Sequence, residues 1–66
     1  MIELRNKDIN EFELIIVLDY LKARGTDSAT IYKGNECVWV ASGSSSYPIN
    51  EYFIFKAGKL VDIQVD

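Results

Sequence analysis

Side chains that commonly perform chemistry are few in this chain, which has one cysteine and no histidine. Cys37 lies in a run of β-branched and aromatic residues, and no histidine base is present to activate it as a nucleophile. One cysteine without histidine also falls short of the ligand set of a zinc site. We therefore expect Cys37 to be a packed side chain in a protein that is not an enzyme, with no catalytic residues, no metal and no cofactor.

The carboxylates are scattered and do not follow the alternating pattern of a calcium-binding loop. Glu11 and Glu13 lie near the start of a predicted helix. Asp62 and Asp66 share a face of the C-terminal segment with Gln64, where acidic residues typically protect a sheet edge from aggregation.

The segment 42–48, SGSSSYP, is rich in hydroxyl groups that could donate to a phosphate or a carbonyl. Phosphate-binding loops normally lead into a helix N-terminus, whereas Pro48 leads into a predicted strand. The segment is therefore either a flexible hairpin connection or, in an alternative function, a small-ligand or nucleotide-binding loop at a subunit boundary. The residues of that alternative site are Ser44, Ser45, Ser46 and Tyr47.

Three aromatic residues, Tyr32, Trp39 and Tyr52, are the best candidates for a recognition surface. Tyr and Trp bury a large area at low entropic cost and dominate many protein interfaces. The same rings could instead pack against the 42–48 loop or against one another as cross-strand pairs. With two apolar neighbours they form the predicted partner-binding set: Tyr32, Trp39, Tyr52, Ile54 and Leu60.

One helix is predicted to position these residues, from Asp8 to Arg24. Asp8 suits the N-cap with Glu11 three residues later, and Gly25 suits the left-handed C-terminal position. Its apolar residues form two stripes at helical spacing, of which we assign the more aliphatic one to the sheet. The first stripe is Leu14, Val17, Leu18 and Leu21, and the second is Ile9, Phe12, Ile16, Tyr20 and Ala23. The second stripe requires a partner, either the N-terminal segment or another chain.

Strand patterns follow from Ala29 onward. A two-residue turn at Gly34-Asn35 would join 29–33 to 36–41, with Tyr32 opposite Cys37 and Ile31 opposite Val38. A three-residue loop ending at Gly58, with a bulge, would set Phe53 opposite Val61. Two faces result. The aliphatic face, assigned to the helix, holds Ile31, Val38, Val40, Phe53, Phe55, Val61 and Ile63. The reverse face holds Tyr32, Trp39, Tyr52, Ile54 and Leu60.

The predicted fold is α+β, with one helix on a four-stranded antiparallel sheet built from two β-hairpins. Ile2 and Leu4 alternate with charged residues and could add a fifth strand or form an extended arm. We expect residues 1–66 to be a single domain, because the chain is too short for a second module.

A formal net charge of −3 with no basic block argues against nucleic-acid binding, although the rings could stack on single strands. The run LIIVL is far shorter than the roughly 20 residues that span a bilayer, and no secretory signal is evident, so a cytoplasmic location is expected. Small domains without disulfides are often reinforced by oligomerisation. The sequence therefore predicts a non-catalytic interaction protein, of inhibitor or adaptor type, that binds a protein partner and forms a homodimer.

Overall fold

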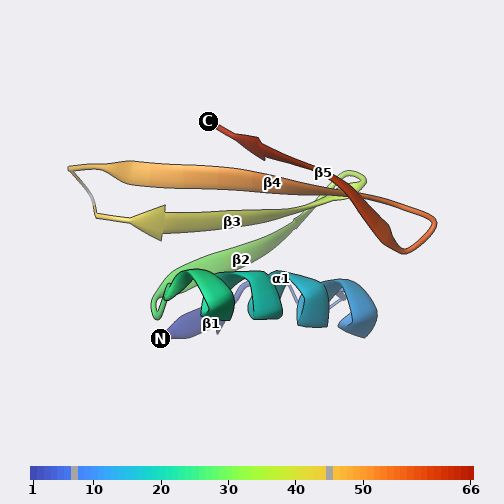
Figure 1. Ribbon diagram of the computed structural model, residues 1–66, viewed down its shortest axis with the longest axis horizontal. Coiled ribbons are helices and arrows are strands. Elements are labelled where there is room, and N and C mark those ends of the chain that lie inside the picture. The colour runs from blue at the N-terminus through green and yellow to red at the C-terminus, as the bar shows by residue number, and fades with distance from the viewer. Residues whose placement is uncertain (7, 45) are drawn as a thin grey trace.

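A computed structural model describes residues 1–6, 8–44 and 46–66. It contains one helix and five strands in the order β1 (Ile2–Leu4), α1 (Glu11–Arg24), β2 (Ala29–Gly34), β3 (Cys37–Gly43), β4 (Pro48–Lys56) and β5 (Lys59–Val65). The strands form one sheet in the order β1-β2-β3-β4-β5. Figure 1 shows α1 on one side of this sheet and the strands following one another away from it.

The α+β class is confirmed, but the sheet is mixed rather than wholly antiparallel. Residues 2–4 form β1, which pairs parallel with β2, while the other neighbouring strands are antiparallel. A parallel pair needs a long crossover connection, and α1 supplies it by carrying the chain from the end of β1 back to the start of β2. The helix therefore belongs to a β-α-β unit, and β3, β4 and β5 extend that unit as a meander.

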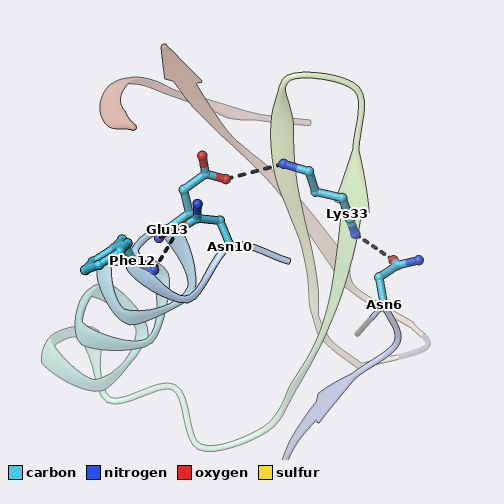
Figure 2. Close-up of polar contacts among 5 residues, drawn as sticks. All are labelled: Asn6, Asn10, Phe12, Glu13 and Lys33. Carbon is cyan, nitrogen blue, oxygen red and sulfur yellow. Dashed lines mark hydrogen bonds and ion pairs between the residues drawn. The ribbon is translucent and has the colours of Figure 1, made fainter. Parts of the chain in front are cut away.

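The N-cap of the helix lies two residues later than the sequence predicts. Asn10, not Asp8, is the N-cap residue: its side-chain oxygen accepts from the backbone N–H of Phe12 at 2.8 Å and of Glu13 at 3.4 Å. Figure 2 shows this cap beside a second set of contacts, in which Asn6 Oδ1 accepts from Lys33 N and Lys33 Nζ pairs with Glu13 Oε1 at 3.3 Å. Asn10 thus satisfies the first helical amides, and Lys33 ties both the preceding segment and the first helical turn to β2.

The helix ends at Gly25, as predicted, with a φ of 83°. The predicted choice of stripe is also confirmed: Val17 and Leu21 are buried in the core, and Leu14 and Leu18 pack against it. From the second stripe Ile9 is buried, and Tyr20 meets the Phe53 ring edge-on at a centroid distance of 5.3 Å. The sheet side of the core consists of Ala29, Ile31, Val38, Val40, Phe53 and Phe55.

The first hairpin has the predicted faces in a different register. Its turn residues are Asn35 and Glu36, so Gly34 pairs with Cys37 and Tyr32 lies directly opposite Trp39. Glu36 takes the positive φ, at 58°, and a Cβ on Gly34 would come within 2.6 Å of Cys37 Sγ. Because the slip is two residues, every side chain stays on its predicted face.

The second hairpin differs from the prediction in the length of its loop and in the faces on which Leu60 and Val61 lie. Ala57 and Gly58 both have positive φ, which suits a two-residue turn, and Lys56 pairs with Lys59. The bulge lies further along β5, so that Phe53 is opposite Ile63 and not Val61. Val61 is consequently 54% exposed, contrary to its predicted place on the aliphatic face. Leu60 is opposite Phe55 and packs against the core, so its predicted place on the reverse face is wrong.

Candidate interaction surfaces

The face of the sheet turned away from α1, called the open face below, carries an aromatic row across its central strands. Tyr32, Trp39 and Tyr52 are direct cross-strand neighbours on β2, β3 and β4, and Gln64 on β5 continues the row. Ile54 and Cys37 form the next row and are half-buried. The structure thus brings four of the five predicted partner-binding residues together, and Leu60 is the exception.

The rings of the aromatic row are nearly parallel to one another. Tyr32 and Trp39 are nearly parallel, with centroids 4.6 Å apart and an interplanar angle of 27°. Two rings this close cannot lie side by side in one plane, so they must be stacked face to face along the row. Trp39 and Tyr52 are stacked with a centroid distance of 6.0 Å, and Trp39 Nε1 donates to Asn50 Oδ1 at 3.2 Å.

This arrangement explains why the three rings are half-buried, and not fully exposed, although no described segment covers them. Each ring is sheltered mainly by its neighbours, which agrees with the cross-strand packing expected as an alternative to an interface. Ring edges and the tyrosine side-chain ends are what the row offers to a partner.

The loop within the segment 42–48 is shorter than predicted, because its ends belong to strands, and only Ser44 of the predicted ligand residues lines a hollow. Ser42 and Gly43 belong to β3, and Pro48 pairs with Gly43. Ser44 and Tyr47 exchange backbone hydrogen bonds, and Ser44 Oγ accepts from Tyr47 N at 3.0 Å. Gly43 has a φ of 82° and no room for a Cβ, which would meet Tyr47 O at 2.4 Å.

Ser44 borders an open hollow of about 360 Å³ at the end of the sheet near β1. Ser42, Ser28, Thr30 and Glu3 contribute the other polar side chains of this hollow. Of the remaining predicted ligand residues, Ser46 is exposed and Tyr47 is 81% exposed, and neither lines the hollow. Ser45 lies outside the described residues.

The outer face of α1, the side turned away from the sheet, carries two large apolar side chains where a surface helix is normally polar. Phe12 is 76% exposed and Ile15 is 56% exposed. Helical spacing puts Phe12, Asp19 and Ala23 within about 40° of one another, with Ile15 beside them. Of the second predicted stripe, Ile9 and Ile16 pack in or against the core, whereas Phe12 stays exposed among the described residues.

A buried ion pair on the helix side of the sheet is absent from the sequence prediction. Glu51 is 2% exposed, and its Oε2 accepts from Arg24 Nη1 at 2.6 Å. This hydrogen bond raises the pKa of Arg24 above its ordinary value, with burial acting in the opposite direction. Arg24 also donates from Nε to Thr26 Oγ1 and lies over the Tyr20 ring. Glu51 Oε1 is buried without a partner among the described residues.

A signal for this pair exists in the sequence. Glu51 alternates with Phe53 and Phe55, which places it on the helix side, and Arg24 follows the last turn of the first stripe. The pair ties the end of α1 to β4, with Glu51 enclosed and Arg24 partly exposed.

The outer edge of β5 is blocked at its centre. Asp66 N donates to Asn50 O, so odd-numbered residues along this part of β5 direct their amides away from β4. The Asp62 side chain accepts from the outward amide of Ile63 at 2.9 Å, and Gln64 Nε2 donates to Asp62 at 3.3 Å. This agrees with the edge protection predicted for the acidic residues of this segment.

Within residues 1–6, 8–44 and 46–66, no cluster of three or more His, Cys, Asp or Glu could hold a metal ion. In the same part of the chain, α1 is too short and too polar to cross a membrane. No model of a known protein family matches the chain, and neither do the curated proteins or the solved structures compared with it.

Proposed function

We propose that this protein is a small non-catalytic interaction protein, of inhibitor or adaptor type, that binds another protein on the open face. The supporting observation is that the central row of this face consists of three aromatic residues and lies under no second layer of described structure. Apolar surface in such a position gains free energy when a partner removes it from water, at about 25 cal/mol per Å².

The orientation of the rings favours protein over single-stranded nucleic acid as the partner. Bases stack on exposed ring faces, but the faces between Tyr32, Trp39 and Tyr52 are occupied by the neighbouring rings. The net charge of −3 also opposes phosphate binding. Ring edges and hydroxyl groups suit the mixed apolar and hydrogen-bonding surface of a protein.

Small-ligand binding is the alternative function, and the hollow beside Ser44 is the observation that favours it. Its volume lies within the range of about 300–1,000 Å³ for ligand pockets, although it is open to solvent.

We also propose that the protein forms a homodimer and is located in the cytoplasm, where Cys37 stays reduced.

Site-directed photo-crosslinking in lysate from the native source tests the open face. A photoreactive residue replaces Ile54 in one variant and Tyr47, on the 81% exposed loop position, in the matched control. We expect a protein to crosslink at position 54 and not at 47. Trp39→Ala should reduce that product at least tenfold while circular dichroism shows a folded chain.

Equal crosslinking at both positions, or a product that survives Trp39→Ala, would contradict the proposal. Oligonucleotide binding that depends on Trp39 would replace it with nucleic-acid recognition. Saturable binding of a small molecule that is abolished by Ser42→Ala and unaffected by Trp39→Ala would favour the alternative.

A further inference from the structure

We infer that the outer face of α1 is a homodimer interface, on which α1 of a second copy packs antiparallel. This inference deepens the proposed homodimer by naming its surface, and it does not depend on the open face. Three features of α1 carry it: two large exposed apolar side chains, a match of large and small side chains, and a match of opposite charges.

The two exposed apolar side chains are the first feature. Phe12 and Ile15 are 76% and 56% exposed on the side opposite the core residues Val17 and Leu21. A helix that is apolar on both sides needs cover on both sides. The sheet covers one side, and no described segment covers the other.

Size complementarity selects a second copy running antiparallel. Phe12 lies one residue from the start of α1 and Ala23 one residue from its end, on the same side of the helix. A two-fold axis through the middle of α1 places each Phe12 over the Ala23 of the other copy, because in a two-fold interface residue i meets j and j meets i. The interface then contains two contacts in which the large ring of Phe12 packs over the small side chain of Ala23.

Charge complementarity selects the same arrangement. Glu11 and Lys22 are exposed, lie about 20° apart on one flank of the helix and occupy opposite ends. Neither forms an ion pair with another described residue. In the antiparallel arrangement Glu11 of each copy lies beside Lys22 of the other, and the opposite helix dipoles are also adjacent.

A parallel arrangement would instead put both Glu11 residues at one end of the interface and both Lys22 residues at the other, on opposite flanks, so no Glu11–Lys22 pair would form. Asp19 lies at the centre of the same face and is exposed. It limits the affinity, because the two-fold axis brings both copies of Asp19 to the interface. Asp19→Asn is therefore expected to strengthen the dimer.

Sedimentation equilibrium over a wide concentration range tests the inference. Phe12→Ser should weaken the dimer about 100-fold, since each dimer loses two buried rings. Tyr47→Ser removes a comparably exposed ring elsewhere and should leave the dimer unchanged. Circular dichroism checks that both variants are folded, and crosslinking at position 54 should persist in Phe12→Ser.

Charge reversal then tests the direction of packing. Glu11→Lys alone and Lys22→Glu alone should each weaken the dimer about tenfold, and an equimolar mixture of the two should restore it. Mixing Glu11→Lys with the wild type should not. A wild type that stays monomeric at millimolar concentration, or a dimer unaffected by Phe12→Ser, would overturn the inference. So would a dimer lost with Trp39→Ala, or a mixture that fails to restore association.

Discussion

The two faces of the sheet are built from the same four long strands, yet their apolar side chains are removed from water in different ways. The helix side is mostly apolar and is enclosed on the central strands, where Ile31, Val38, Val40 and Phe53 have 0% exposure. The open face has no covering layer and uses rings that shelter one another. Burial on the first side comes from another element, whereas on the second it comes from cross-strand neighbours.

Aromatic rings can therefore stabilise an uncovered sheet face and still leave a surface for a partner. Stacked rings lose contact with water on their faces and keep their edges accessible. The face that depends on α1 should therefore be sensitive to truncation, and the open face should tolerate it.

The largest expected effect contrasts two adjacent residues of β4. Phe53→Ala should lower the free energy of unfolding by about 3–5 kcal/mol, because it removes a buried ring beneath Tyr20 and leaves a cavity. Tyr52→Ala, on the open face, should cost about 1–2 kcal/mol, since its ring is only half-buried. Urea denaturation followed by circular dichroism measures both. Equal losses would show that the two faces contribute alike.

The ion pair between Arg24 and Glu51 contributes to the stability of the helix side. Arg24→Met should cost about 3 kcal/mol, the lower end for a broken buried pair, because the Arg24 side chain is 36% exposed. The loss arises from leaving the Glu51 carboxylate buried without its cation. The double variant Arg24→Met, Glu51→Leu should recover most of this loss in the same denaturation experiment. If the double variant is as unstable as Arg24→Met, the penalty comes from lost packing and not from the unpaired charge.

The third prediction concerns coupling within the aromatic row. A double-mutant cycle of Tyr32→Leu and Trp39→Leu should give a coupling of about 1 kcal/mol, because the rings are 4.6 Å apart. The corresponding cycle for Trp39 and Tyr52 should give less, since those centroids are 6.0 Å apart. Equal couplings, or none, would show that the row does not depend on stacking.

Side-chain alternation accounts for what could be predicted from the sequence. The faces of β2, β3 and β4 follow from period-two patterning, which a slip of two residues does not disturb, so Tyr32, Trp39, Tyr52 and Ile54 share the predicted surface. The helix stripe that meets the sheet could also be predicted, from the aliphatic character of its residues.

Features that depend on contacts between distant segments could not be predicted. The two-residue turn at Ala57-Gly58 places Leu60 opposite Phe55, and the bulge at Val61 then brings Ile63, in place of Asp62, opposite Phe53. The parallel pairing of β1 depends on where α1 returns the chain. Asn10, and not Asp8, caps the helix, and the preceding Asn6 accepts from Lys33 N of β2, a contact between segments 27 residues apart in the sequence.

The smallest expected effect lies at the edge that the two faces share. Asp62→Ala removes the acceptor of the outward Ile63 amide, which is already near solvent, so stability should fall by no more than about 0.5 kcal/mol. Association should change more, because an unprotected edge strand can pair with a neighbouring chain. Light scattering at high concentration should therefore show larger, β-rich species for Asp62→Ala and not for Asp66→Ala. If both variants stay as dispersed as the wild type, Asp62 does not protect the edge, and exposed apolar side chains such as Val61 and Val65 govern self-association there.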